Sequence, residues 1–137
     1  MTRVQYFTDK QISVDEFIDV LNRSTLAERR PVHDRQRIEL MLKHANILIT
    51  AWSNDLLIGV SRAWSDFSFV CYLSDLAVDV AHQKKGIGKE LIRQTHQVSG
   101  QKTTTLILLA APAAIEYYPK IGMEQYVHCF KIDRISS

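Results

Sequence analysis

The stretch Gln83-Lys84-Lys85-Gly86-Ile87-Gly88 decides how the centre of this chain folds. Residues 73–80 before it are typical of a strand, and residues 89–98 after it are typical of a helix. A glycine turn between a strand and a helix exposes backbone N–H groups at the helix N-terminus, where the helix dipole favours negative charge. The stretch therefore predicts a site for a phosphate or a pyrophosphate, to which Lys84, Lys85 and Lys89 add electrostatic attraction.

Two familiar phosphate motifs do not fit this stretch. A P-loop has four residues between its glycines and ends in Gly-Lys-Ser/Thr. Here a single residue separates the glycines, and Glu90 follows Lys89. A dinucleotide-binding fingerprint has a third glycine three residues after the second, where this chain has Leu91. The pattern that remains is Gln/Arg-x-x-Gly-x-Gly/Ala.

This pattern resembles the acyl-CoA pyrophosphate loop of the GNAT (GCN5-related) N-acetyltransferases. The alternative is a glycine-rich turn that enters a helix and binds nothing. The resemblance implies acetyl-CoA as cosubstrate, with its pyrophosphate held by Gln83, Lys84, Lys85, Gly86, Ile87, Gly88 and Lys89.

Length and composition favour one soluble globular domain over residues 1–137, with 46% hydrophobic and 23% charged residues. The net charge of +2 and the scattered basic residues give no reason to expect nucleic-acid binding. The longest apolar run, residues 106–115, contains Pro112 and is too short to span a bilayer, so we expect no membrane partner. No signal peptide is recognisable at the N-terminus, which makes a cytoplasmic location the expectation.

The cysteines and histidines predict no metal site. Cys71 and Cys129 each fall in an expected strand, and neither belongs to a CxxC or Cys/His spacing. We therefore expect two buried, reduced thiols. The five histidines are scattered along the sequence without an HExxH pattern.

Hydrophobic periodicity predicts an α/β protein with a mixed sheet, in the order β-α-α-β-β-β-α-β-α-β. Ser13 and Glu16 form a capping-box pair before the first helix, and Asn54-Asp55 marks the turn of a hairpin. The helix after the glycine loop makes a crossover, so the strands around it should be parallel and adjacent. The expected strands cover residues 3–7, 47–52, 56–64, 67–80, 103–109 and 123–132, and the expected helices cover 14–21, 38–45, 86–98 and 112–118.

The order of elements agrees with the GNAT resemblance over essentially the whole chain, and a second motif supports it. Residues 114–123 read Ala-Ile-Glu-Tyr-Tyr-Pro-Lys-Ile-Gly-Met, similar to the family pattern Ala-x-x-Phe-Tyr-x-Lys-x-Gly-Phe. The resemblance implies that Tyr118 is the general acid and Tyr117 a core aromatic residue. Pro119 should end the helix near Tyr118. Ala111 stands where the family often has a cofactor-binding Asn.

The strand before the loop should carry the rest of the site. By resemblance, Leu76, Ala77 and Val78 occupy a β-bulge whose backbone binds the pantetheine arm, and the Val78 N–H polarises the acetyl carbonyl. Asp75 is the candidate that accepts a proton from the amine, and a water chain is the alternative. The loop with Glu28, Arg29 and Arg30 should wall the acceptor site.

The sequence therefore predicts a single-domain GNAT-like acyl-CoA N-acyltransferase fold. The predicted activity is transfer of an acetyl group from acetyl-CoA to a primary amine of a small molecule or a peptide, by direct attack. A homodimer is compatible with the sequence. The alternative function is a non-catalytic module that senses acyl-CoA or docks a partner.

Overall fold

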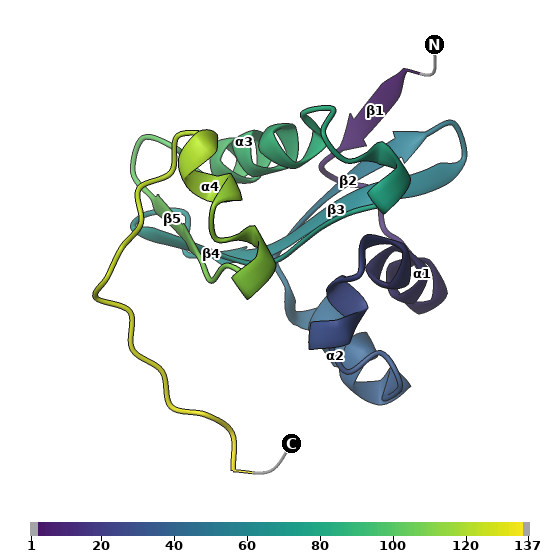
Figure 1. Cartoon of the computed structure of the whole chain (residues 1–137), viewed down its shortest axis with the longest axis horizontal. Coiled ribbons are helices and arrows are strands. Elements are labelled where there is room, and N and C mark those ends of the chain that lie inside the picture. The colour runs from purple at the N-terminus through teal and green to yellow at the C-terminus, as the bar shows by residue number, and fades with distance from the viewer. Residues whose placement is uncertain (1–2, 136–137) are drawn as a thin grey trace.

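The computed structural model describes residues 3–135. Its centre is a five-stranded sheet in which the strands follow one another in chain order, from β1 at one edge to β5 at the other (Figure 1). The strands are β1 (Val4–Phe7), β2 (Ile47–Ser53), β3 (Leu56–Ser65), β4 (Val70–Val78) and β5 (Thr105–Leu108). The helices are α1 (Val14–Ser24), α2 (Arg35–His44), α3 (Ile87–Ser99) and α4 (Tyr117–Lys120), with short 3₁₀ turns at Leu26–Arg29, Val80–His82 and Pro112–Ala114.

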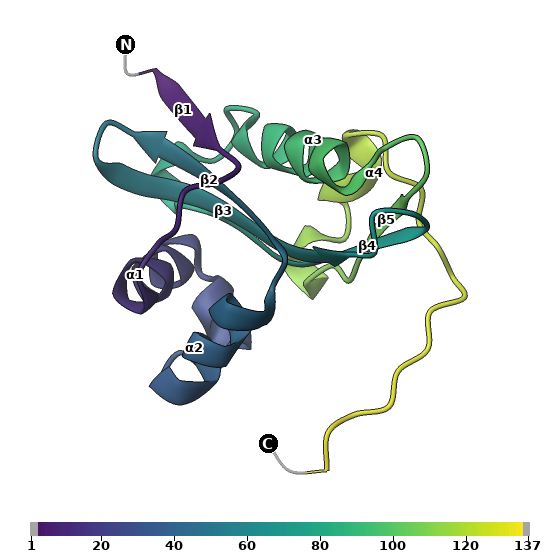
Figure 2. The same ribbon diagram turned by 180° about the vertical axis from the view of Figure 1, so that it is seen from behind.

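Helices cover both faces of the sheet. Figures 1 and 2 show α1 and α2 on one face and α3 with α4 on the other. Each face has its own apolar cluster: Leu91 of α3 packs with Ile49 and Leu73, whereas Phe17 and Leu21 of α1 pack with Val60. These layers fix the positions of the helix ends relative to the strands.

Local signals in the sequence produce several of these elements. The capping box is present at α1, because the Ser13 Oγ accepts from the Glu16 N–H and the Glu16 carboxylate accepts from the Ser13 N–H. The predicted hairpin is confirmed, with Leu56 paired to Ser53 across the turn. No helix of the described residues is both long enough and apolar enough to cross a membrane.

The predicted crossover is confirmed, because β4 and β5 are parallel neighbours joined through α3. Their pairing is short and runs from Val70 with Thr105 to Leu73 with Leu108. Beyond Leu73 the two strands separate, so within residues 3–135 the second half of β4 has a strand partner on the β3 side alone. The separation leaves an open edge of β4 that faces the N-terminus of α3.

The β-bulge of β4 lies before the position that the sequence suggested. Arg62 of β3 pairs with Asp75, whereas the next residue, Ala63, pairs with Leu73, so Ser74 is the extra residue. The prediction of a bulge within residues 76–78 was wrong, since those residues pair regularly with β3. A bulge reverses which face the following side chains occupy. Leu76 therefore packs on the α3 face and Ala77 on the α1 face.

The end of the chain departs most from the sequence-based expectations. Residues 123–132 form no strand among the described residues, so the predicted last strand was wrong. Cys129 is consequently exposed, whereas Cys71 is buried as expected. β5 is exposed on one face, where Ile107 is 45% exposed. The short helix α4 also continues through Pro119 to Lys120, past its predicted end.

Candidate active site

The loop before α3 presents a row of backbone donors. Lys84 and Gly86 both have left-handed backbone angles, with φ of 65° and 82°, and they turn the chain into the helix. Gly86 is the N-cap of α3 and offers no side chain to cap it. Among the described residues, the N–H groups from Lys84 to Lys89 have no protein acceptor. This arrangement is a ready anion site at a helix N-terminus.

Some side chains of this loop are exposed to solvent, whereas others are buried or contact the sheet. Lys84, Lys85 and Lys89 are exposed, and they surround the free N–H groups with positive charge. Ile87 is buried in the core beneath α3, so it can contribute through its backbone alone. Gln83 turns back to the sheet, where its Nε2 donates to the Val78 carbonyl at 3.0 Å.

Two hydrogen bonds show to which side the backbone groups of β4 point: the bond from Gln83 to the Val78 carbonyl, and a bond from Asp79 to β3. The Asp79 N–H donates to the Ile58 carbonyl at 2.8 Å, toward β3. Backbone groups alternate along a strand, so Leu76 and Val78 direct their N–H and C=O groups to the open edge. Ala77 directs its backbone groups to Val60 on β3. Of the three predicted pantetheine contacts, Leu76 and Val78 thus have free donors, and Ala77 does not.

Tyr117 reaches the same place from α4. A Cβ placed on Gly88 would lie 2.9 Å from the Tyr117 Oη and 3.9 Å from the Leu76 Cδ2. The Tyr117 hydroxyl therefore lies against the first turn of α3, beside the open edge of β4. The prediction of a core aromatic residue was wrong here, since Tyr117 is exposed. The contact depends on where α4 packs, which the motif around Tyr118 does not encode.

Tyr118 is the more enclosed of the two tyrosines. Its ring meets that of Tyr117 edge to face, with centroids 5.2 Å apart. Burial, and to a lesser extent the neighbouring Tyr117, raises the pKa of the Tyr118 hydroxyl above its usual 10. The hydroxyl is thus a proton donor that stays protonated at neutral and moderately alkaline pH.

Asp75 lies on the α1 face of β4 between two arginines. One carboxylate oxygen accepts from the Arg30 Nε and the other from the Arg62 Nε, and the carboxylate is fully buried. Arg30 also donates to the Ser74 carbonyl at 2.7 Å, and Arg62 to the Met41 carbonyl at 3.0 Å. These contacts tie the loop after α1 to the bulge of β4. They favour a positioning role for Asp75, and its role as a proton acceptor stays a prediction.

Asp75→Asn should lower the free energy of unfolding by about 3 kcal/mol, because it leaves two guanidinium groups, one of them buried, without their counter-charge. Denaturant unfolding measures the change. Asp19→Asn is the matched control, since Asp19 pairs with Arg23 on the exposed surface and should cost less than about 1 kcal/mol. Equal losses in the two variants would contradict the positioning role.

Some residues of the loop that was expected to line the acceptor site are already held by contacts within the protein. Arg30 is held by Asp75, and Asp34 caps α2 by accepting from the Arg37 N–H at 3.2 Å. Among the described residues, Glu28 and Arg29 form no ion pair. They are therefore the charges of this loop that remain available to an acceptor. No group of three His, Cys, Asp or Glu side chains in the described part of the chain could hold a metal ion.

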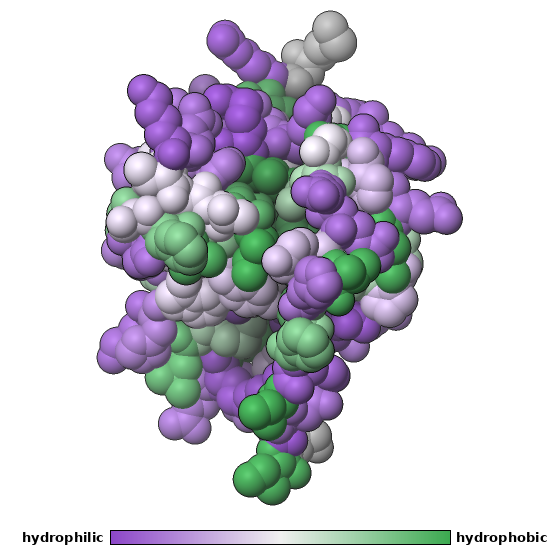
Figure 3. Space-filling view, turned by 90° about the vertical axis from the view of Figure 1, so that its left-hand side faces the viewer, coloured by the Kyte–Doolittle hydropathy of each residue, from purple (hydrophilic) through white to green (hydrophobic). Residues whose placement is uncertain are grey.

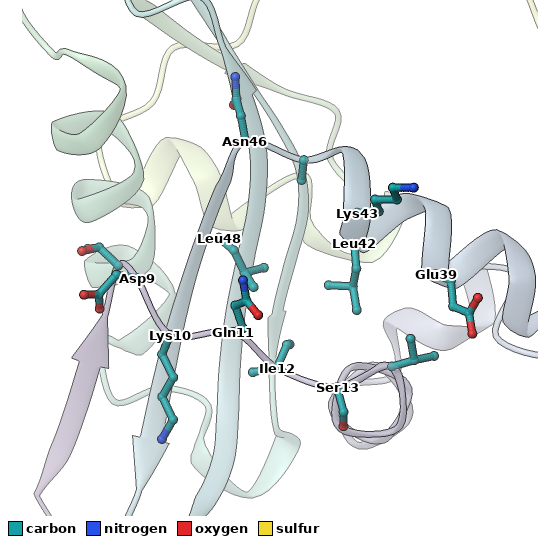
Figure 4. A pocket seen from close by; sticks show the side chains of 13 residues that line it. Asp9, Lys10, Gln11, Ile12, Ser13, Glu39, Leu42, Lys43, Asn46 and Leu48 are labelled. Carbon is teal, nitrogen blue, oxygen red and sulfur yellow. The ribbon is translucent and has the colours of Figure 1, made fainter.

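A separate hollow of about 700 Å³ lies where the segment before α1 passes α2 and β2. Figure 4 shows apolar Ile12, Leu42 and Leu48 among charged side chains such as Glu39 and Lys43. None of its lining residues belongs to the glycine loop, to β4 or to α4. It is therefore distinct from the candidate active site.

Comparisons with known sequences agree on one family. Residues 14–123 match the Acetyltransferase (GNAT) family. The uncharacterized N-acetyltransferase ycf52 of Pyropia yezoensis is 27% identical over 85% of this chain and 71% of its own length. The protein of the same name from Porphyra purpurea is 30% identical over 69% of this chain and 55% of its own length, so the chain spans about half of that relative.

Solved structures share the fold at low sequence identity. A probable acetyltransferase from Staphylococcus aureus has a TM-score of 0.77 at 19% identity, covering 96% of this chain and all of its own. The aminoglycoside N-acetyltransferase AAC(6')-Iy, solved in complex with CoA, has a TM-score of 0.75 at 13% identity, covering 98% of this chain and 97% of its own. These structures thus share the overall fold of this chain. Since the family match covers most of the sequence, the chain belongs to the GNAT family and is an acetyltransferase.

Proposed function

We propose that this protein transfers an acetyl group from acetyl-CoA to a primary amine. One observation carries the proposal: the free backbone donors of the α3 N-terminus, the open edge of β4 and Tyr117 of α4, whose ring contacts that of Tyr118, meet at one place. The donors at the α3 N-terminus suit a pyrophosphate, and the open edge of β4 suits the amide-bearing pantetheine arm. The tyrosine pair suits a leaving thiolate that needs a proton.

The residues that would hold acetyl-CoA follow from these contacts. The backbone from Lys84 to Lys89 binds the pyrophosphate, and Gln83 braces the end of β4 through the Val78 carbonyl. The free N–H groups of Leu76 and Val78 bind the pantetheine arm and polarise the acetyl carbonyl. Ala77 supports this edge through its pairing with β3. When bound, acetyl-CoA supplies a thioester whose acyl group is open to attack by an amine.

Two proton transfers accompany the reaction. A lysine-like amine has a pKa of about 10.4, so about one molecule in 2,500 is neutral at pH 7 and the proton needs an acceptor. The ion pairs of Asp75 favour a water chain for this task over the carboxylate. Tyr118 donates its proton to the departing thiolate, whose parent thiol has a pKa of about 8.5. Attack, carbonyl polarisation and thiolate protonation then occur without a covalent enzyme intermediate.

The acceptor is a small-molecule or peptide amine. The relatives support both classes: AAC(6')-Iy is an aminoglycoside acetyltransferase, and TAP1 of Glycine max, 35% identical over half of this chain, is a histone acetyltransferase. Glu28 offers a contact to a cationic acceptor and Arg29 one to an acidic acceptor.

An amine screen tests the proposal directly. The protein is incubated with acetyl-CoA and a panel of aminoglycosides, polyamines, amino acids and lysine peptides, and the released CoA thiol is measured. Amine-dependent thiol release supports acetyl transfer. Tight CoA binding without release across the panel would instead identify a non-catalytic acyl-CoA-binding module.

Lys84→Ala and Lys85→Ala should each weaken CoA binding by about two- to fivefold at low salt, and by less at high salt. Both lysines are exposed, so their attraction is screened, whereas the backbone donors of α3 are unchanged. Calorimetry at two salt concentrations measures the effect. Lys102→Ala removes the same charge beyond the other end of α3 and should leave affinity unchanged. Complete loss of binding in either loop variant would reverse the assigned roles.

A further inference from the structure

A buried carboxylate lies where β4 ends and the approach to the glycine loop begins. Asp79 directly follows β4, is 6% exposed, and takes no part in the proposed chemistry. Its Oδ1 accepts from the Ala81 N–H at 2.8 Å, and its backbone carbonyl accepts from the His82 N–H at 2.8 Å. Asp79 is thus the N-cap of the 3₁₀ turn Val80–His82, and it sets the direction in which the chain leaves the sheet.

An arginine at the end of α1 holds the other carboxylate oxygen. The Arg23 Nη1 donates to the Asp79 Oδ2 at 2.6 Å, and its Nη2 donates to the Leu57 carbonyl of β3 at 2.7 Å. Burial alone would raise the pKa of Asp79, but the bonds from Ala81 and Arg23 outweigh it and hold the pKa below its usual value. The carboxylate is therefore charged at neutral pH, and one guanidinium joins α1, β3 and the end of β4.

The approach to the glycine loop, residues 80–85, has few other anchors. Among residues 3–135, its hydrogen bonds to residues outside this range end on Asp79 and on the Val78 carbonyl, which accepts from the Gln83 Nε2. Lys84 has a positive φ of 65°, a conformation that a lysine keeps only where its surroundings hold it. The course of this segment therefore depends on how firmly Asp79 and Val78 are fixed.

We propose that the Arg23–Asp79 ion pair positions the glycine loop for CoA, an inference that rests on acetyl-CoA as the donor. The pair fixes the end of β4 and the turn Val80–His82, and this turn leads into the free N–H groups from Lys84 to Lys89. Without the pair the loop samples other conformations, and only the fraction with aligned donors binds CoA. Arg23 and Asp79 are thus positioning residues, which act on the cofactor through the loop.

The ion pair is remote from the exposed apolar side chains of the protein. Arg23 lies in the last turn of α1, at the right in Figure 1. Figure 3 views the molecule from the left of Figure 1, and it shows apolar side chains at the surface of the body and along the projecting C-terminal segment, residues 123–135. Substitutions at Arg23 or Asp79 leave that face unchanged. A loss of CoA affinity in such variants therefore cannot arise from altered association through it.

Asp79→Asn tests the ion pair while it keeps the cap of the turn. The side-chain oxygen of asparagine can still accept from the Ala81 N–H, whereas an uncharged amide faces Arg23. The Kd for CoA should rise about tenfold, as expected for the loss of one hydrogen bond between charged groups. With an amine that the screen identifies, kcat at saturating acetyl-CoA should stay within about twofold of the native value. Calorimetry gives the affinity, and urea unfolding gives the stability.

Two control variants separate positioning from a general loss of stability. Val20 is fully buried in the same helix, so Val20→Ala should lower the urea midpoint at least as much as Asp79→Asn and leave CoA affinity unchanged. Asp19→Asn removes the exposed partner of Arg23 and should also leave affinity unchanged.

Substitutions of Arg23 test the same contact from the other side. Arg23→Met removes the charge and should raise the Kd for CoA about as much as Asp79→Asn does. The double variant should bind CoA no more weakly than Arg23→Met alone, because both substitutions break one contact. Arg23→Lys keeps a positive charge beside Asp79 and should recover most of the affinity.

The outcomes that would overturn the positioning role are distinct from failure of the proposed function. Native CoA affinity in folded Asp79→Asn and Arg23→Met, together with a lower urea midpoint, would make the pair a structural contact alone. Additive losses of affinity in the double variant, or a fall in kcat without a change in affinity, would also overturn it. A native protein that binds no CoA would instead overturn the proposed donor, and the positioning role with it.

Discussion

Gly86→Asp should lower the affinity for CoA by at least about 10³-fold while the protein remains folded. Gly86 lies at the N-cap of α3, and a Cβ built there meets no atom within 4 Å, so the new side chain has space. Its carboxylate would stand where the pyrophosphate approaches the free N–H groups, and juxtaposed like charges cost several kcal/mol. Calorimetry with CoA gives the affinity, and circular dichroism verifies the fold.

Gly86→Asn is the matched control for this variant. Asparagine has nearly the same shape as aspartate, and both residues tolerate the positive φ of 82° better than other non-glycine residues. The asparagine variant should therefore show the cost of the side chain and the backbone angle without the charge, and should lose about tenfold or less. If Asp and Asn weakened binding equally, charge repulsion would not be the cause. If Asp left affinity unchanged in a folded protein, the anion site would lie elsewhere.

Tyr118→Phe should lower kcat by about 10²- to 10⁴-fold and leave CoA affinity nearly unchanged. The substitution keeps the ring and removes the hydroxyl, which acts on charge that develops as the thiolate leaves. Rates at saturating substrates near neutral pH measure the effect. Since burial raises the pKa of Tyr118, the native enzyme should lose this acid at more alkaline pH than an exposed tyrosine would.

Tyr117→Phe separates the roles of the neighbouring tyrosines. The Tyr117 hydroxyl lies against Gly88 in the first turn of α3, so its loss should alter CoA affinity and leave kcat within a few fold of the native value. A kcat for Tyr118→Phe within twofold of the native enzyme would make Tyr118 a packing residue. A large loss of kcat in Tyr117→Phe would transfer the role of acid to Tyr117.

Short-range patterns in the sequence account for much of the fold. The Ser13–Glu16 capping box, the hairpin turn at residues 54–55 and the glycine loop at Gly86 each depend on residues close in the chain, and the structure contains all three. The parallel pairing of β4 and β5 was predictable as well, because a helical crossover between strands requires it.

Other features depend on contacts between distant residues, and the sequence alone did not reveal them. Asp75 meets Arg30 and Arg62 because the bulge at Ser74 turns its side chain to the α1 face, and nothing near Asp75 in the sequence encodes that register. Tyr117 approaches Gly88 because α4 packs near the first turn of α3.

The C-terminal segment shows the same division. Its alternating, β-branched residues favour a strand, and the sequence determined that preference by itself. A strand forms only when a neighbouring edge accepts its backbone hydrogen bonds, so pairing is a property of the tertiary or quaternary structure. The sequence thus determined helices α1 to α3, the hairpin and the glycine loop before α3, since local propensity and periodicity are sufficient for them. Only the tertiary structure decided which edge of β4 stays open, which tyrosine meets the loop and whether the last strand has a partner, because each depends on groups far apart in the chain.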